Sequence, residues 1–528
     1  MKKLKYIGIL AVVASLTLVS CGKDIEDVNI NPNDPELVPS NSIFNSATQE
    51  YFSNTRDAFN HGRFTLNWME YWGQNSYADE DRYLYRETTA TNSYNVVYLV
   101  ATDLKSVIEL NANEDTKVAA AAYGNNNNQI AASRIMLSYM FHQLTNTFGD
   151  VPYWSYGSDD PDFQALQVDE ILSPVFAPQQ KIYMDILKEL RESADMIDVS
   201  APVFTSGDNI FDGDALKWKK FANSMILRVA TMLKGVDAAA ANSAITAAIA
   251  DGVMESNDDN AAQHYEDNDA NANPMWRAFL TRTDFAVSAP FVDLLKGKTG
   301  NFGPDPRLFH MAAPIDAGIA EVKAGTYEQS TNYDDYVGVP YAYNKVNRIP
   351  FTLYSFPSSQ VLKPDFAEML MEYSEVEFLL SEFNGFAQAN YEAGVRASME
   401  KWEVPTASID AFVSALPAAT KETVLNQKYV ALYMQGHQSY AEARRTGYPN
   451  SDILFLPGET YTLPPAQAAK TEEASYQFVS GVLDLTTLPS RSRYPVGLQT
   501  LNGENRAAAV SKLSDGDTVK SKLFWDVD

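Results

Sequence analysis

A single cysteine constrains this 528-residue chain more than any other feature. Cys21 is the only thiol, so no disulfide can form within the chain and no other cysteine can act in catalysis. The fold must therefore be held together by the burial of apolar side chains. A body of roughly 500 residues is long enough to bury a large core.

The position of Cys21 predicts a lipid anchor. Lysines at positions 2, 3 and 5 precede an apolar run at 7–19, and Leu18-Val19-Ser20-Cys21 closes that run. A basic start, a short apolar stretch and small residues before the cut are typical of a secretory signal peptide. Lipoprotein processing requires a cysteine at the new N-terminus, whereas ordinary signal peptidase does not. We therefore expect residues 1–20 to be removed and Cys21 to be lipidated; the alternative is a plain signal peptide with a coincidental cysteine.

No later apolar stretch has the length of about 20 residues that a spanning helix needs. The body is therefore expected to be tethered to a membrane and not threaded through it. Acidic residues at 24, 26 and 27 fit either a tag for export to the cell surface or an ordinary linker. Residues 28–40 are rich in Asn and Pro, which predicts an extended linker. We therefore expect a lipidated linker at 21–40, followed by one domain at 41–528.

The charge of the chain argues against nucleic-acid partners. Its 41 lysines and arginines are outnumbered by 68 aspartates and glutamates, which gives a formal net charge of −27. Such a surface repels phosphate backbones and anionic lipids. We therefore expect no nucleic acid among the partners.

Apolar residues recur at helical spacing through most of the body. One stripe consists of Trp218, Phe221, Met225, Val229 and Met232, a second runs over 366–380 and a third over 425–433. Further helices are predicted near 41–60, 92–111, 129–147, 179–197, 239–250, 387–402 and 497–511, and short strands only at 83–85 and 348–354. The pattern predicts a mainly α fold, a superhelical scaffold of paired helices with long irregular loops and a few short strands. Trp218, Trp402 and Trp525 are assigned to packing.

The sequence contains no HExxH, GxSxG, GxGxxG or GxxxxGK motif, and its five histidines lack ligand spacing. With 68 carboxylates some acidic pair arises by chance, so an acidic glycoside hydrolase stays open as a less favoured alternative. Five acidic residues between 258 and 269 have the oxygen ligands of a structural calcium site without the EF-hand spacing, so a solvated loop is the simpler interpretation. The asparagines at 125–128 are interpreted as a polar loop. We expect no catalytic residues and no cofactor.

Aromatic density marks one segment of the chain. The twenty positions 67–86 hold six aromatic residues, where the chain average of 12% predicts two or three. Saccharide sites pair flat aromatic faces with amide, carboxylate and guanidinium groups that hydrogen-bond to hydroxyls. We therefore predict a ligand-binding site that consists of Trp72, Gln74, Tyr77, Arg82 and Tyr85, together with Trp276 and Arg282 from a second patch.

A core role competes with this interpretation for part of the set. Trp68, Tyr71 and Trp72 lie at i, i+3 and i+4, which is the spacing of a buried helical stripe. Trp68 and Tyr71 are assigned to the core on that ground. Trp72 lies beside Gly73 at a predicted helix end and fits either role, as does Trp154.

Six short motifs, in this order along the chain, resemble one family. Asn-Ile-Asn-Pro-Asn at 29–33 follows the predicted anchor, and Phe-Gly-Asp-Val-Pro-Tyr at 148–153 ends a helix. The others are Gly-Asp with Lys-Trp-Lys-Lys-Phe at 213–221, Glu-Val-Glu-Phe-Leu-Leu at 375–380, Glu-Ala-Arg-Arg-Thr-Gly-Tyr-Pro at 442–449, and Arg-Tyr-Pro at 493–495 with Phe-Trp-Asp at 524–526. Together they are similar to the SusD/RagB-type nutrient-binding outer-membrane lipoproteins of Bacteroidota, and within these to the SusD-like branch.

The resemblance implies four tetratricopeptide-like helix pairs and an irregular face that carries the ligand site. It also implies a partner, a SusC-like TonB-dependent transporter barrel on which such a protein sits as a lid. Ligands of the family are mostly oligosaccharides, and some members take peptides. Glu442, Arg444 and Arg445 are expected to satisfy buried charge in the scaffold. Binding residues do not transfer by motif, so the site prediction rests on the aromatic pattern.

We therefore expect a non-catalytic lipoprotein on the cell surface, anchored in the outer membrane. It would capture nutrient, foremost an oligosaccharide, and pass it to the transporter. A peptide-binding member of the family is the main alternative. An acidic glycoside hydrolase and a structural lid or adhesin without cargo are the others.

Overall fold

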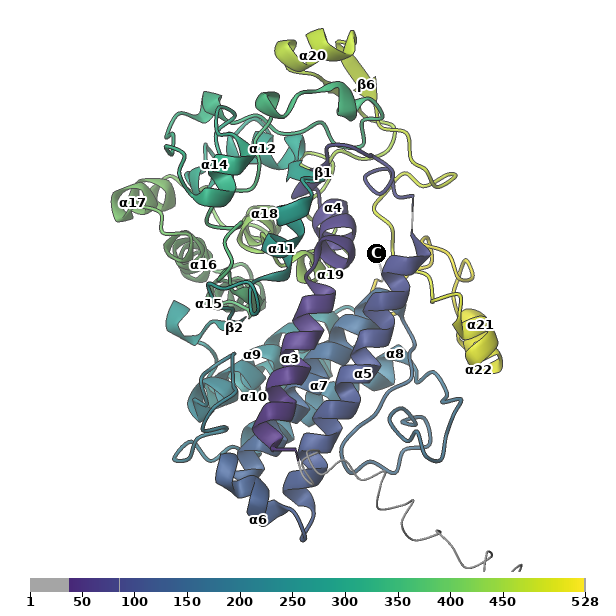
Figure 1. Cartoon of the computed structure of the whole chain (residues 1–528). Helices are drawn as coiled ribbons and strands as arrows, with labels where there is room; N and C mark the ends of the chain where they lie inside the picture. Colours follow the sequence, from purple (N-terminus) through teal and green to yellow (C-terminus); the bar gives the residue numbers. More distant parts are fainter. Residues whose placement is uncertain (1–37, 85, 527–528) are drawn as a thin grey trace, which may run out of the picture. The chain divides into compact units, whose positions relative to one another are not determined.

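Helices that follow one another along the chain pack against each other (Figure 1). The computed structural model describes residues 38–84 and 86–526. Its α-helices are α3 (Ser40–Thr55), α4 (Leu66–Trp68), α5 (Glu87–Ala112), α6 (Lys117–Ala120), α7 (Asn126–Phe148), α8 (Gln179–Met196), α9 (Ala215–Leu233), α10 (Ala238–Asp251), α11 (Pro274–Thr281), α12 (Ala289–Leu295), α13 (Leu308–Met311), α14 (Ile319–Ala324), α15 (Tyr373–Phe383), α16 (Gln388–Lys401), α17 (Thr406–Ser414), α18 (Lys421–Ala431), α19 (Gly436–Thr446), α20 (Pro465–Thr471), α21 (Leu498–Leu501) and α22 (Gly503–Val510). The predicted mainly α class is therefore confirmed.

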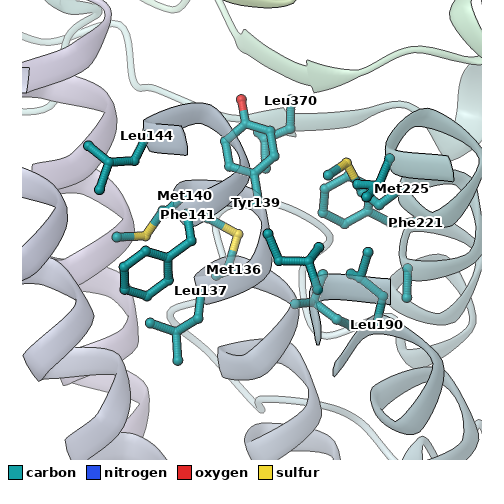
Figure 2. Close-up of a cluster of buried hydrophobic side chains, with 14 of the residues drawn as sticks. Met136, Leu137, Tyr139, Met140, Phe141, Leu144, Leu190, Phe221, Met225 and Leu370 are labelled. Atoms are coloured by element: carbon teal, nitrogen blue, oxygen red, sulfur yellow. The ribbon is translucent and has the colours of Figure 1, made fainter. Parts of the chain in front are cut away.

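The first group of helices forms a layered scaffold around α7. Each of α3, α5, α7, α8, α9 and α10 packs on the next. Almost every residue of α7 from Asn128 to Phe148 is buried, so this helix lies at the centre of the group. Figure 2 shows Met136 and Phe141 of α7 in one apolar cluster with Leu190 of α8 and Phe221 of α9. Full burial of each such side chain contributes about 1.5–3 kcal/mol, which makes this layer the stable support of the molecule.

The local sequence explains where α7 begins and ends. The side chain of Asn125 accepts a hydrogen bond from the N–H of Asn128 at 3.2 Å, which satisfies one of the free donors of the first turn. At the other end Gly149 adopts a φ of 95° and donates its N–H to the carbonyl of Thr145 at 2.9 Å. The helix predicted at 129–147 is therefore present and begins slightly earlier, at Asn126.

Helices α15 to α18 form the second group, and a buried ion pair joins it to the first. Arg228 of α9 donates to both carboxylate oxygens of Glu375 of α15 at 2.8 and 2.5 Å, and the two side chains are 0% and 1% exposed. Trp218, Trp402 and Trp525 are all buried, as predicted.

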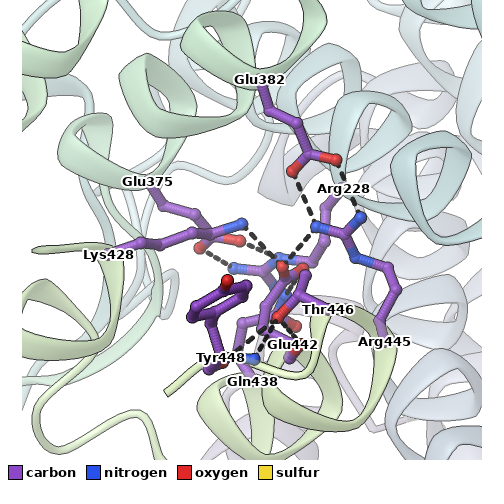
Figure 3. A network of polar contacts seen from close by, with 9 residues as sticks. All are labelled: Arg228, Glu375, Glu382, Lys428, Gln438, Glu442, Arg445, Thr446 and Tyr448. Atoms are coloured by element: carbon purple, nitrogen blue, oxygen red, sulfur yellow. Dashed lines mark hydrogen bonds and ion pairs between the residues drawn. The ribbon is translucent and has the colours of Figure 1, made fainter. Parts of the chain in front are cut away.

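The α19 motif carries a second cluster of buried charge (Figure 3). Glu442 accepts from Arg445 at 2.7 Å and lies 3.1 Å from the ammonium of Lys428, while Arg445 also holds Glu382. The prediction for Glu442 and Arg445 is therefore confirmed. Arg444 differs, because its guanidinium donates to the backbone carbonyls of Ser490 and Asn146 instead of a carboxylate.

The strands of the described chain pair in three small antiparallel sheets. β1 (Trp72–Gln74) pairs with β3 (Phe285–Val287), β2 (Ala261–Gln263) with β4 (Glu368–Met371), and β5 (Thr460–Thr462) with β6 (Ser475–Gln477). In the first sheet Trp72 is opposite Val287 and Gln74 is opposite Phe285. This register sets the loop at 75–84 beside residues 281–284, which are about 200 positions away in the sequence.

Several element predictions are wrong, among them the helix predicted at 497–511, which is two short helices, α21 and α22. The described part of 83–85 is irregular, and 348–354 contains the 3₁₀ turns η5 (Val346–Arg348) and η6 (Phe351–Leu353) where strands were predicted. The apolar stripe at 366–380 is not one helix, because β4 occupies its first part and α15 begins only at Tyr373. Short apolar runs fit helix and strand equally well, so the available pairing partner decides between them.

A π-helix follows α3. The sequence predicts one helix at 41–60, whereas α3 ends at Thr55 and the π-helix η1 spans Ala58–Thr65. The carboxylate of Asp57 caps η1 by accepting the N–H groups of Phe59 at 3.0 Å and Asn60 at 2.7 Å. π-Helical turns are rare and are often found at functional sites. We therefore expect η1 to have a role beyond packing.

Within the described residues, no helix combines the length and the apolar character that crossing a bilayer requires. Cys21 lies outside these residues, so its lipidation stays a prediction.

Candidate ligand-binding site

The β1–β3 pairing brings the two predicted patches together. The N–H of Asn75 donates to the carbonyl of Asp284 at 3.0 Å, and its side-chain amide donates to the carbonyl of Thr283 at 2.7 Å. Residues after β1 and residues before β3 therefore share one surface. Tyr77 belongs to the first segment and Arg282 to the second. The two patches predicted from the sequence are therefore neighbours in the fold.

A small cavity of about 130 Å³ opens on this surface between η1, the end of α11 and β3. We call it the arginine cavity. Its lining consists of Ala58, Phe59, Arg63, Ala278, Phe279, Thr281, Arg282, Asp284 and Phe285. The lining thus combines aromatic rings, two guanidinium groups and a carboxylate.

The ring of Phe59 gives this cavity an exposed flat face. Phe59 is 45% exposed, and the guanidinium of Arg63 lies 4.7 Å from its ring centroid, which is cation–π geometry. Both residues lie on η1, whose first turn Asp57 caps. A ring supported in this way changes position little when a ligand arrives, so less conformational entropy is lost on binding.

A chain of ion pairs holds the arginines in place. Asp284 contacts Arg63 at 3.2 Å and Arg282 at 2.9 Å, and Glu80 contacts Arg63 at 4.0 Å and also Arg86. Within the described chain Arg282 uses only its Nε for this contact, and its side chain is 47% exposed. Its two Nη groups can therefore donate hydrogen bonds to a ligand.

Asp81 organises the loop from beneath. Its carboxylate accepts the N–H groups of Gln74 at 3.2 Å and Ala342 at 3.3 Å and the side-chain amide of Asn67. Burial outweighs these hydrogen bonds and raises the pKa of Asp81 to about 7. The part of this loop at 75–84 is thus held in place by a buried carboxyl.

Arg82 faces a second cavity of about 300 Å³, which we call the hairpin cavity because β5 and β6 are nearby. Its lining includes Asn344, Tyr476 and Gln477, and Arg82 is held by Asp79 at 2.9 Å and by the carbonyl of Ala78 at 3.0 Å. Amides, a phenol and a guanidinium again meet on the surface of the same loop.

Trp72 and Gln74 correct the sequence-based prediction. Trp72 has no exposed surface; its indole N–H donates to the hydroxyl of Tyr433 at 2.9 Å and its ring packs edge-on to Phe279. Gln74 is 1% exposed and lies in the same small sheet. Neither side chain can touch a ligand in this structure, because both face the core. Trp68 and Tyr71 are buried as predicted.

The other predicted residues lie at or near the surface. Tyr77 is 52% exposed, Arg82 and Arg282 line the two cavities, and Trp276 is half-buried on α11, whose last turn borders the arginine cavity. Tyr85 lies outside the described residues. Arg82 and Arg282 line two different cavities and Tyr77 lines neither, so a single site made of these residues stays a prediction.

Phe59 and Arg63 were missed by the sequence analysis. Their i, i+4 spacing is that of an aromatic residue and an arginine on one helical face, which was the available signal. The hairpin residues Tyr476 and Gln477 had no such signal, because 394 and 395 positions separate them from Arg82.

The acidic segment considered for calcium is used in local contacts. Asp259 pairs with Lys220 at 3.0 Å, and Glu266 accepts from the amides of Asn268 at 2.6 Å and Asn271 at 2.9 Å. No group of three or more metal-binding side chains occurs in the part of the chain that the structure describes.

Comparison with known proteins places the chain among SusD-like sequences. Residues 32–459 match a SusD-like family described as starch-binding associating with outer membrane, and residues 418–526 match the SusD and RagB outer membrane lipoprotein family. Among curated proteins none gives a significant match.

Solved structures share the fold over nearly the whole chain. A chitin-binding protein is 25% identical with a TM-score of 0.68, and the alignment covers 91% of this chain and 100% of that one. A SusD homologue from Parabacteroides distasonis is 20% identical with a TM-score of 0.71, covering 92% and 98%. A chitin-binding SusD homologue from Flavobacterium johnsoniae is 19% identical with a TM-score of 0.67, covering 92% and 99%.

Proposed function

Because this chain belongs to the SusD-like family of outer-membrane lipoproteins, we propose that it captures a saccharide nutrient at the outer membrane. Two similar structures are described as chitin-binding, which supports a saccharide over other ligands. The single observation that carries the proposal in this chain is the arginine cavity, where an exposed phenyl ring lies beside two fixed guanidinium groups.

The chemistry of this region suits a sugar ring. An apolar C–H face of the sugar can stack on Phe59, while its hydroxyls accept from the free Nη groups of Arg282 and donate to Asp284. The cavity is smaller than the roughly 300–1,000 Å³ of pockets that enclose a ligand. We therefore place one sugar ring in it and let the remaining rings extend over the surface toward Tyr77 and the hairpin cavity.

The protein acts by binding and hands its cargo on. Cys21 carries the lipid that anchors it to the outer surface, and a SusC-like TonB-dependent barrel takes the saccharide from it. A receptor that must release its cargo needs only micromolar to millimolar affinity, which corresponds to roughly −8 to −4 kcal/mol. Asp284 and Glu80 are both paired with arginines. These pairs are suited to hold the arginines in position and are not suited to transfer a proton to a glycosidic bond.

Affinity electrophoresis in gels that contain starch, chitin derivatives, xylan or pectin tests the proposal. Phe59→Ala and Arg282→Ala should each weaken retention of the wild-type ligand. If stacking on a sugar resembles stacking on a base, at about 1–3 kcal/mol, the dissociation constant rises roughly 5- to 150-fold. Because both side chains are nearly half exposed, the melting temperature should change little.

Matched controls come from the same chain. Phe351→Ala removes a ring that is 42% exposed outside the site, and Arg396→Ala removes an arginine paired with exposed Asp410. Both should bind like the wild type. If retention is unchanged in Phe59→Ala and Arg282→Ala, the arginine cavity is not the binding site. Failure of every saccharide, with binding of a casein peptide digest, would assign peptide capture instead.

A further inference from the structure

Another, roomier cavity lies away from this site. Its volume is about 830 Å³, and it opens between the end of α5, α6, the start of α7 and the loop at 201–205. We call it the asparagine cavity, because Asn111, Asn125, Asn126 and Asn127 line it together with Tyr156 and Thr205. The asparagine run, interpreted from sequence as a polar loop, is thus one wall of a concave surface.

We propose that the asparagine cavity is a second saccharide-binding site. The inference rests on the proposed function, since it assigns a further site for the same class of ligand. Amide groups both donate and accept, as sugar hydroxyls do, and an aromatic ring supplies the stacking face. A volume within the roughly 300–1,000 Å³ of ligand pockets has room for more than one sugar ring.

The charge of the cavity favours a neutral ligand. Lys117 is the one charged residue of its lining, and its ammonium already contacts Glu114 at 2.6 Å. The lining therefore contains no free charge that could pair with an anionic or a cationic ligand. A neutral molecule rich in hydroxyl groups matches the amides without that cost.

The ring of Tyr156 packs against an arginine side chain of the protein. The guanidinium of Arg134 lies 4.9 Å from the ring centroid, and Arg134 is fixed by Glu189 at 2.8 Å and by Glu192 at 2.5 Å. Tyr156 also lines the cavity, and its hydroxyl forms no hydrogen bond to the rest of the described chain. A supported ring with an unused hydroxyl is suited to stack on and bond to a sugar.

The walls of the cavity are fastened to each other. The N–H of Asn125 donates to the carbonyl of Pro202 at 3.1 Å, and the N–H of Thr205 donates to the carbonyl of Tyr123 at 2.8 Å. Gly124 approaches so closely that a Cβ there would lie 2.1 Å from the carbonyl oxygen of Val203, and its φ is 146°. The cavity therefore exists before a ligand arrives.

The amides divide into structural and free ones. The side chain of Asn126 donates to Asn111 at 2.8 Å and to the carbonyl of Lys117 at 2.9 Å, which fixes both residues. Asn127 is exposed, and its side-chain amide forms no hydrogen bond within the described residues. Asn127 and Tyr156 are thus the two side chains with unused bonding capacity that can be changed without loosening the walls.

The two sites are separate, because α3 lies between them. Ser40 at the start of α3 donates to Gln129 at 2.6 Å, beside the asparagine cavity, while η1 with Phe59 follows the other end of α3. The 16 residues of α3 span about 24 Å at 1.5 Å per residue. Figure 1 shows α6 and α11 at opposite ends of this helix.

Counting bound trisaccharides separates the two sites. Isothermal titration and native mass spectrometry are run with chitotriose, maltotriose, cellotriose and xylotriose, on the wild type, on Asn127→Ala/Tyr156→Ala and on Phe59→Ala/Arg282→Ala. We expect two trisaccharides per wild-type chain and one in each double variant. The site that is removed should weaken roughly fivefold or more. If the loss of Tyr156 disturbs folding, Asn127→Ala alone tests the site, because it changes an exposed side chain. Asn242→Ala on the exposed side of α10 is the control for this variant.

Each result bears on one proposal or on both. One trisaccharide per wild-type chain, unchanged in Asn127→Ala/Tyr156→Ala and lost in Phe59→Ala/Arg282→Ala, would overturn the second site and keep the proposed function. The reverse pattern would support the asparagine cavity and overturn the arginine cavity. No trisaccharide bound to the wild type would overturn both.

Discussion

Replacing Glu442 by glutamine tests the buried charge cluster that joins α15, α18 and α19. Glu442 is 4% exposed and contacts Arg445 at 2.7 Å, Lys428 at 3.1 Å and the amide of Gln438 at 3.2 Å. Arg445 keeps Glu382 after the change, whereas Lys428, itself 1% exposed, loses the only carboxylate within 4 Å of its ammonium in the described chain. The substitution Glu442→Gln therefore leaves a buried cation without a counter-charge.

The pKa of Glu442 sets the expected cost. Burial alone would raise it, but the charges of Arg445 and Lys428 and their hydrogen bonds prevail and lower it from 4.5 to about 2. At about 1.4 kcal/mol per pKa unit, the charged form contributes about 3 kcal/mol to the free energy of unfolding. Removal of one partner of a buried pair costs a similar amount, about 3–5 kcal/mol. With an unfolding entropy of about 2 cal/mol/K per residue, the melting temperature should fall by about 3 °C.

The sign of the pH dependence follows from the lowered pKa. A carboxyl whose folded pKa is below its unfolded value stabilises the fold fully above about pH 4.5, and this contribution is lost as the pH falls toward 2. Scanning calorimetry at pH 7, 4 and 3 should therefore show the wild type and Glu442→Gln converging in acid. Asp410→Asn, which breaks the exposed pair with Arg396, should cost under about 1 kcal/mol at every pH. A Glu442→Gln protein as stable as the wild type at pH 7, or a difference that persists undiminished in acid, would refute the reasoning.

Two further predictions concern residues singled out by the sequence. Trp72→Ala should lower the free energy of unfolding by about 3–5 kcal/mol, because the ring is fully buried, whereas Tyr77→Ala at an exposed position should change it by about 0.5 kcal/mol or less. Thermal unfolding of the two variants measures this difference. A Trp72→Ala protein that is as stable as the wild type but no longer binds ligand would show that Trp72 belongs to the binding site. Cys21→Ser should move the protein from the membrane to the supernatant fraction and abolish acylation of the mature chain in the mass spectrum; an unchanged membrane fraction would contradict lipidation as the anchor.

The helical scaffold was predictable because its signal is local. The stripe of Trp218, Phe221 and Met225 repeats with the helical period, and the structure buries all three in α9. The α19 motif was interpreted through the family resemblance, and the structure bears this out for Glu442 and Arg445, whereas Arg444 bonds to backbone carbonyls. The exception at 366–380 lies where β4 found a partner in β2, about 100 positions earlier.

The candidate site was only partly predictable, because solvent exposure is a property of the fold. Trp72 and Tyr77 belong to the same aromatic segment, yet Tyr433 and Phe279 cover the first, whereas the second is 52% exposed. Residue type does not separate them, since an indole ring packs in a core as well as it stacks on a sugar. Phe59 was overlooked because its importance depends on Arg63 beneath it and on Arg282 across the cavity.

The amino-acid sequence by itself determined that the fold is mainly helical and free of internal disulfides. These properties follow from composition and from spacings of a few residues. The tertiary structure alone decided which aromatic rings face solvent, that β1 meets β3 across about 200 positions, and that the asparagines at 125–128 border a cavity. Those outcomes depend on contacts between distant segments, whose free energies are settled only when the whole chain packs.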